Sequence, residues 1–189
     1  MLARADKIAP ADLDAYLVTY YDLGWVLDDA GQRLALSLGP EAYDDDKAQT
    51  ALVRAQLSGG RGDQAASRAW GDSDQREFSL QLRDAPNNAQ LHALRGLALA
   101  YAGRRDEAVP EGERALALAP LAQNGTNTPY FMHLLVRIYI HTGQPDKAVD
   151  QLEKLMAVPY FVTPAWLRID PEFAPLQGNP RFDRLAQNK

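Results

Sequence analysis

Cysteine is absent from this chain of 189 residues. The absence excludes disulfide bonds and thiolate metal sites, and it is compatible with either redox setting. The chain also lacks a run of about eighteen apolar residues, so we expect no membrane insertion. The first ten residues, MLARADKIAP, contain no apolar segment of the kind that a signal peptide needs. The sequence therefore predicts a soluble protein, which would be cytoplasmic if the chain is complete as given.

Basic residues are outnumbered by acidic ones. Lys and Arg total 20 against 25 Asp and Glu, which gives a formal net charge of -5 and a pI near 5.2. Nucleic acids and anionic membranes attract basic faces, so we expect neither as the main partner.

Signals of catalysis and metal binding are also missing. The three histidines, His92, His133 and His141, lack the short spacing that zinc ligands need, and we expect them to be structural or groove-lining. There is no Gly-x-Ser-x-Gly motif, and no serine has a recognisable histidine and carboxylate partner. The loop over 58–62 (SGGRG) lacks the Gly-Lys-Ser/Thr ending of a phosphate-binding loop. We expect no catalytic residue, no cofactor and no metal, and hence a protein that is not an enzyme.

What the sequence does contain is helical periodicity. Apolar residues recur at intervals of three and four over 90–102 (QLHALRGLALAYA), and Gly103 ends this helix. A return helix begins at Asp106, runs to about 118 and is stopped by Pro120. Pro110 and Gly112 lie inside it, and we expect tertiary packing to override their low helix propensity.

The same order of elements occurs twice more. Downstream, a helix from Thr128 turns at Gly143 into a return helix over 146–157, which Pro159 stops. Upstream, a weaker copy has a helix over 44–57, with the acidic run 44–46 as its N-cap, a turn at Gly60, and a return helix to about 83. Small residues lie five positions after each turn glycine, where paired helices approach closely: Ala65, Ala108 and Ala148.

Each helical pair leaves one apolar face uncovered, and stacking of neighbouring pairs buries it. The sequence therefore predicts an all-α fold, an α-solenoid of about three helix-turn-helix units over 43–86, 87–120 and 127–159. A helix over 11–29 belongs to an N-terminal extension, 9–38, and short helices separated by prolines form a cap, 160–189. We expect all of these parts to form one domain, 1–189.

Five residues in the second unit resemble the signature of the tetratricopeptide repeat (TPR) family: Gly96, Gly103, Ala108, Ala115 and Pro120. Most of the chain is also similar to the C-terminal TPR region of bacterial multidomain signalling proteins that carry a protein kinase or nucleotide cyclase domain. The resemblance implies a scaffold for protein binding. No kinase or cyclase motif occurs in the chain, so no catalytic role follows from it.

In the TPR family the first helix of each unit lines a concave face. Counting back from the turn glycines predicts a peptide-binding groove of Lys47, Thr50, Arg54, Gln90, Ala93, Leu97, Tyr130, His133, Arg137 and Ile140. An apolar floor flanked by arginines favours an acidic or carboxylate-bearing peptide. The alternative is a regulatory or scaffold segment that docks on its own protein or self-associates as a homo-oligomer. In that case the groove is empty or is filled by the chain's own tail.

Overall fold

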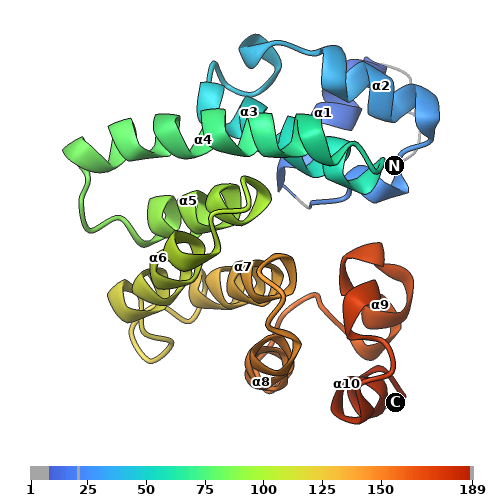
Figure 1. Cartoon of the computed structure of the whole chain (residues 1–189), viewed down its shortest axis with the longest axis vertical. Helices are drawn as coiled ribbons and strands as arrows, with labels where there is room; N and C mark the ends of the chain where they lie inside the picture. Colours follow the sequence, from blue (N-terminus) through green and yellow to red (C-terminus); the bar gives the residue numbers. More distant parts are fainter. Residues whose placement is uncertain (1–8, 21, 188–189) are drawn as a thin grey trace, which may run out of the picture. The chain divides into compact units, whose positions relative to one another are not determined.

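The computed structural model describes residues 9–20 and 22–187 (Figure 1). All regular structure in these residues is helical, which confirms the predicted all-α class. None of the described helices is both long and apolar enough to cross a membrane. The packing divides the chain into two compact units, and the boundary between Glu77 and Phe78 lies inside helix α4 (Gln64–Asp84).

The first unit is built from short helices and the first part of α4. Its elements are α1 (Pro10–Tyr20), η2 (Gly24–Val26), α2 (Asp29–Ser37), η3 (Pro40–Ala42) and α3 (Lys47–Gly60). The prediction of a single helix over 11–29 was wrong, because α1 ends at Tyr20 and a new helix begins after Asp28. The chain instead comes close to α3 at Gly24, where a Cβ atom would lie 2.6 Å from a methyl carbon of Leu57.

Helix α3 has the acidic N-cap that the sequence predicts. The Asp46 carboxylate accepts hydrogen bonds from the amides of Ala48 at 2.8 Å and Gln49 at 3.1 Å. The helix begins at Lys47, however, and not at residue 44. Asp44 and Asp45 have positive φ angles of 57° and 59°, a region that aspartate enters more readily than most residues, and they form the turn before the helix.

The turn after α3 comes two residues later than predicted. Gly62, and not Gly60, has a positive φ of 83°, close to the 80° of Gly103 and the 71° of Gly143. Ser67, five residues after Gly62, is buried and donates a hydrogen bond to the Ala55 carbonyl at 2.9 Å. Ala65 is exposed, so its predicted role in helix packing was wrong.

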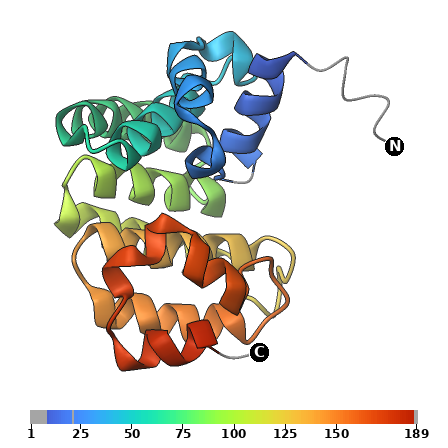
Figure 2. The ribbon, with the colours of Figure 1, turned by 90° about the vertical axis from the view of Figure 1, so that its right-hand side faces the viewer.

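The second unit contains the two helical pairs with the clearest sequence signals. After the end of α4 come α5 (Ala89–Tyr101), α6 (Arg105–Leu118), α7 (Thr128–His141), α8 (Pro145–Met156), α9 (Pro164–Ile169), η4 (Pro171–Leu176) and α10 (Pro180–Gln187). Helix α5 packs against α6, and α7 packs against α8 and also against α5 and α6. Figure 2 shows the C-terminal helices, in red, in front of α7 and α8, in orange.

Glycines allow α5, α6 and α7 to meet closely. A Cβ atom at Gly96 would lie 3.0 Å from both the Ala108 carbonyl oxygen and the Gly112 nitrogen, which are backbone atoms of α6. A Cβ atom at Gly112 would lie 2.8 Å from methyl carbons of Leu135 and Ile138 on α7. Gly112 is therefore more than a tolerated helix breaker, because the two side chains of α7 fill the space that it leaves.

Candidate functional site

Helix α7 holds four of the predicted groove residues, and most of its length is buried. His133 is 3% exposed and Arg137 is 5% exposed. With His141 they recur every fourth residue, which places three side chains able to carry positive charge along one side of the helix. We call His133, Arg137 and His141 the basic side of α7.

The basic side of α7 is covered by the C-terminal segment, residues 160–187. Oε1 of Glu172 lies 2.8 Å from His141 Nε2 and 3.6 Å from Arg137 Nε. The next residue, Phe173, is fully buried and stacks on the His133 ring, with 6.1 Å between ring centroids and 14° between ring planes. A carboxylate and a phenyl ring on neighbouring residues therefore contact successive turns of α7.

The electrostatics of this cluster keep Glu172 ionised. Burial by itself raises the pKa of the Glu172 carboxyl group, but the nearby charges of His141 and Arg137 outweigh burial and lower the pKa to about 2. A residue of helix α5 also contacts this cluster, since Arg137 donates a hydrogen bond to the Tyr101 hydroxyl at 3.1 Å. The Tyr101 ring in turn packs on the His141 ring, with centroids 4.3 Å apart.

The conformation of Glu172 and Phe173 is set by hydrogen bonds within the C-terminal segment itself. Asp170 caps η4 by accepting a hydrogen bond from the Glu172 amide at 2.9 Å. The other carboxylate oxygen of Asp170 accepts a hydrogen bond from Trp166 Nε1 at 2.9 Å. Burial raises the pKa of Asp170, although both hydrogen bonds oppose the rise. Glu172 is thus aimed at α7 by bonds that do not involve α7.

Three predicted groove residues belong to the first unit, and two of them use their polar groups there. Thr50 is buried, and its hydroxyl donates a hydrogen bond to the Asp46 carbonyl at 2.7 Å. Arg54 donates to the Leu38 carbonyl at 2.7 Å and lies 4.7 Å from the centroid of the Trp70 ring. Lys47 is the exposed first residue of α3. Arg54 therefore holds the chain that follows α2.

The remaining predicted groove residues differ in exposure. Ala93 and Leu97 on α5 are buried, at 1% and 0% exposed. Gln90 is exposed, while Tyr130 and Ile140 on α7 are half-buried. In the second unit the structure thus brings His133 and Arg137 together on the face that the C-terminal segment covers.

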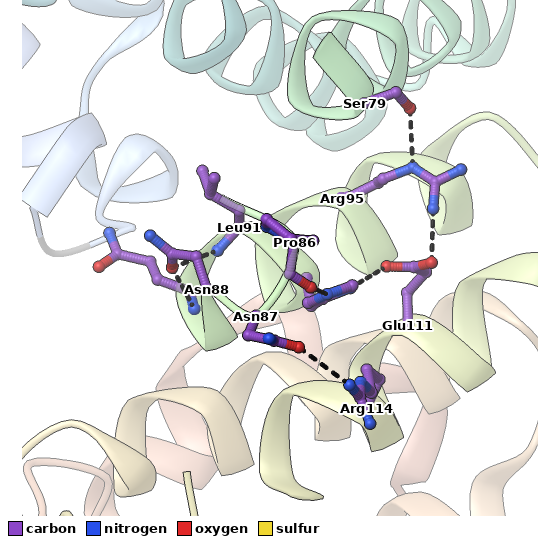
Figure 3. A network of polar contacts seen from close by, with 10 residues as sticks. Ser79, Pro86, Asn87, Asn88, Leu91, Arg95, Glu111 and Arg114 are labelled. Atoms are coloured by element: carbon purple, nitrogen blue, oxygen red, sulfur yellow. Dashed lines mark hydrogen bonds and ion pairs between the residues drawn. The ribbon is translucent and has the colours of Figure 1, made fainter. Parts of the chain in front are cut away.

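A second polar cluster joins α5 to α6 and to the end of α4 (Figure 3). Arg95 donates hydrogen bonds to the Ser79 hydroxyl at 2.9 Å and to Glu111 Oε1 at 2.5 Å. The two ring nitrogens of His92 lie 2.6 Å from Glu111 Oε2 and 3.0 Å from the Pro86 carbonyl oxygen. A carbonyl and an ionised carboxylate only accept, so His92 makes both bonds when its ring is doubly protonated. These polar groups bond one another and hold α5 against α6 and the end of α4, so we interpret the cluster as structural.

Other ligand sites are poorly supported. Within residues 9–20 and 22–187, no three His, Asp or Glu side chains are arranged to hold a metal ion. A cavity of about 210 Å³ in the C-terminal segment is lined by Leu167, Arg168, Gln177, Phe182, Asp183, Ala186 and Gln187. It is smaller than the roughly 300 Å³ at which small-molecule pockets begin. The basic side of α7 is therefore the candidate site, and its chemistry suits recognition of a carboxylate followed by an aromatic ring.

Sequence reasoning missed Glu172 and Phe173 as site residues. The order Asp170-Pro171 does carry a local signal, because aspartate is a favoured N-cap and proline a favoured first helical residue. That signal predicts the start of a helix and nothing about what the helix contacts. The pairing with α7 joins residues that are far apart in the chain, and no short-range pattern reveals it.

No protein-family model, no curated protein and no solved structure matches this chain. The resemblance to TPR proteins therefore rests on the pattern of glycines, alanines and prolines alone, and function has to be argued from the site.

Proposed function

We propose that the chain is a non-catalytic protein-interaction module that binds an acidic peptide segment along the basic side of α7. One observation carries the proposal: all three members of the basic side contact a single acidic-aromatic pair, Glu172-Phe173. A surface that accommodates this pair from its own chain has the charge and shape to accommodate it in a partner. Stacked helical pairs of the TPR type, which present extended faces to partners, are the scaffold that we propose for it.

The contact of Glu172-Phe173 with the basic side of α7 also supports a second candidate function. In this alternative the chain is a regulatory or scaffold segment of a larger signalling protein, which docks in cis or self-associates. The two candidates differ in one measurable respect, namely whether a free acidic peptide gains access to the basic side of α7.

Binding of a short fluorescent peptide with a central Glu-Phe pair tests the proposal. His141 is the member of the basic side to change, because its side chain is 27% exposed and a substitution there can be solvated. We expect His141→Glu to weaken binding by about tenfold or more, and the peptide affinity to fall as salt is added. Lys154→Glu on the exposed face of α8 is the matched control and should leave the affinity unchanged. Equal affinities for all three proteins would show that the basic side of α7 is not the binding surface.

A further inference from the structure

We infer that the run Asp170–Phe173 is an internal pseudo-ligand. A partner of the proposed module then carries the same chemistry, an acidic residue directly followed by a phenyl ring, and it displaces the C-terminal segment when it binds. This inference rests on the proposed function and specifies both the partner and the regulation of the same site.

The first argument is that the basic side of α7 cannot stand empty. The Arg137 side chain is 6% exposed. Its guanidinium group forms an ion pair with Glu172 and donates a hydrogen bond to the hydroxyl of Tyr101. Removing the Glu172 carboxylate would break a buried ion pair, which typically costs about 3–5 kcal/mol. A partner that takes this place therefore has to bring its own acidic group and exchange with Glu172, and it cannot simply add to the surface.

The second argument is that the pseudo-ligand is preformed. Asp170 bonds the Glu172 amide and the Trp166 indole, both within the same short stretch of chain. A partner peptide with an acidic N-cap before its Glu-Phe pair can form the same turn without help from α7. Such a peptide loses less conformational entropy on binding than a flexible one does.

The third argument concerns how the C-terminal segment is held. Its ion pairs with α8, from Arg181 to Asp150 and Glu153 at 2.7 and 2.5 Å, are exposed, and exposed pairs contribute little. Residues 157–159, which connect it to α8, contain no helix. The segment is thus held mainly by the buried side chains of Leu167, Phe173, Leu176 and Phe182 and by Glu172. As a tethered competitor it reduces the apparent affinity of any partner by the fraction of time that the site is open.

The test uses a fluorescent peptide with the chain's own residues 164–178 and three full-length proteins: wild type, Glu172→Lys and Glu107→Lys. Glu172→Lys weakens the internal contact and leaves α7 unchanged. Glu107→Lys makes the same charge reversal on an exposed position of α6, where Glu107 pairs only with Arg104 in the contacts that the structure shows. We expect the peptide to bind Glu172→Lys at least about tenfold more tightly than wild type and the Glu107→Lys control. A peptide with glutamine in place of its glutamate should bind none of them tightly.

Three results would overturn the inference. Equal binding to wild type and Glu172→Lys would mean that the segment does not compete, and no binding to Glu172→Lys would mean that the segment is a cap only. A Glu172→Lys dimer in sedimentation, with peptide binding absent, would assign the site to the tail of a second copy. If the unrelated Glu-Phe peptide nevertheless binds wild type in a His141-dependent way, the proposed function survives and only this inference fails.

A second measurement covers the case in which Glu172→Lys does not fold. A protease site placed between Ala157 and Pro159 leaves every residue of the contact native, and cleavage turns the internal contact into a bimolecular one. We expect the cleaved C-terminal fragment to dissociate on dilution and to be displaced by the residue 164–178 peptide. A fragment that stays bound while excess peptide fails to enter would refute displacement.

Discussion

Substitution of Gly96 by alanine tests the helix packing on which the site depends. In an exposed helix interior this change stabilises a protein by about 1 kcal/mol, because alanine is the better helix former. At Gly96 the new Cβ atom would lie 3.0 Å from two backbone atoms of α6 and 2.9 Å from a methyl carbon of Ile138. The methyl group can rotate away, whereas the backbone contacts can be relieved only if α5 and α6 move apart.

The magnitude follows from these opposed effects. Forcing extra volume into a close-packed site costs about 1–3 kcal/mol, and the gain in helix propensity offsets about 1 kcal/mol of that. We therefore expect Gly96→Ala to destabilise the second unit by about 1 kcal/mol and by no more than about 2. At Gly112 the close atoms are side-chain methyl groups of Leu135 and Ile138, so Gly112→Ala should be less costly.

Gly60→Ala is the control with the opposite expected sign. Gly60 is helical, and no atom lies within 4 Å of a Cβ atom built there, so propensity acts alone and stability should rise by a few tenths to about 1 kcal/mol. Urea unfolding followed by circular dichroism gives the three free energies of unfolding. A Gly96→Ala protein that is as stable as Gly60→Ala would refute the close approach of α5 and α6.

Three further predictions concern charge and register. Neither Asp74 oxygen has a hydrogen-bond partner, and burial, with a smaller effect of Asp46, raises its pKa well above the usual value. A raised folded-state pKa favours folding at low pH and the benefit is lost as pH rises, so Asp74→Asn should match wild type near pH 4 and be more stable by about 1–3 kcal/mol at pH 8, as urea unfolding at both pH values would show. The lowered pKa of Glu172 has the opposite sign: Glu172→Gln should cost on the order of 3 kcal/mol at pH 7, and the difference from wild type should vanish as pH falls from 4.5 towards 2. Ser67 is buried and Ala65 is exposed, so Ser67→Glu should unfold the first unit, while Ala65→Glu should change its melting temperature little. If Ala65→Glu were the more damaging change, the turn after α3 would lie at Gly60 and not at Gly62.

Local signals predicted the parts of the fold that local physics controls. The Asp46 N-cap and the turns at Gly103 and Gly143 each depend on a few neighbouring residues, and each is present. The turn after α3 was misplaced because glycines stand at 59, 60 and 62, and any of them can adopt a positive φ. Tertiary packing decides which one does so, and a turn at Gly62 places Ser67 where it can bond the Ala55 carbonyl.

The site was only partly predictable for a related reason. The resemblance to TPR proteins, with a count back from Gly143, was enough to name His133 and Arg137 as candidate binding residues. It contained no information on what would cover them, because the contact with Glu172 and Phe173 is made across a long stretch of chain. Counting back from turn glycines also treats every helical pair alike, whereas α7 is covered by the C-terminal segment and not by a further helical pair of the same kind.

A cover for this side of α7 does not by itself require charge. An apolar side chain at position 172 would bury the same face, and replacing a buried ion pair by apolar groups is often neutral or stabilising. This chain instead places a carboxylate there, with Arg137 and His141 around it, and accepts the cost of removing those charges from water. Stability alone gives no reason for such a choice, whereas recognition does, because paired charges discriminate between partners by penalising a segment that lacks the matching group. The ionic character of the contact is thus the feature that separates a pseudo-ligand from a simple cap.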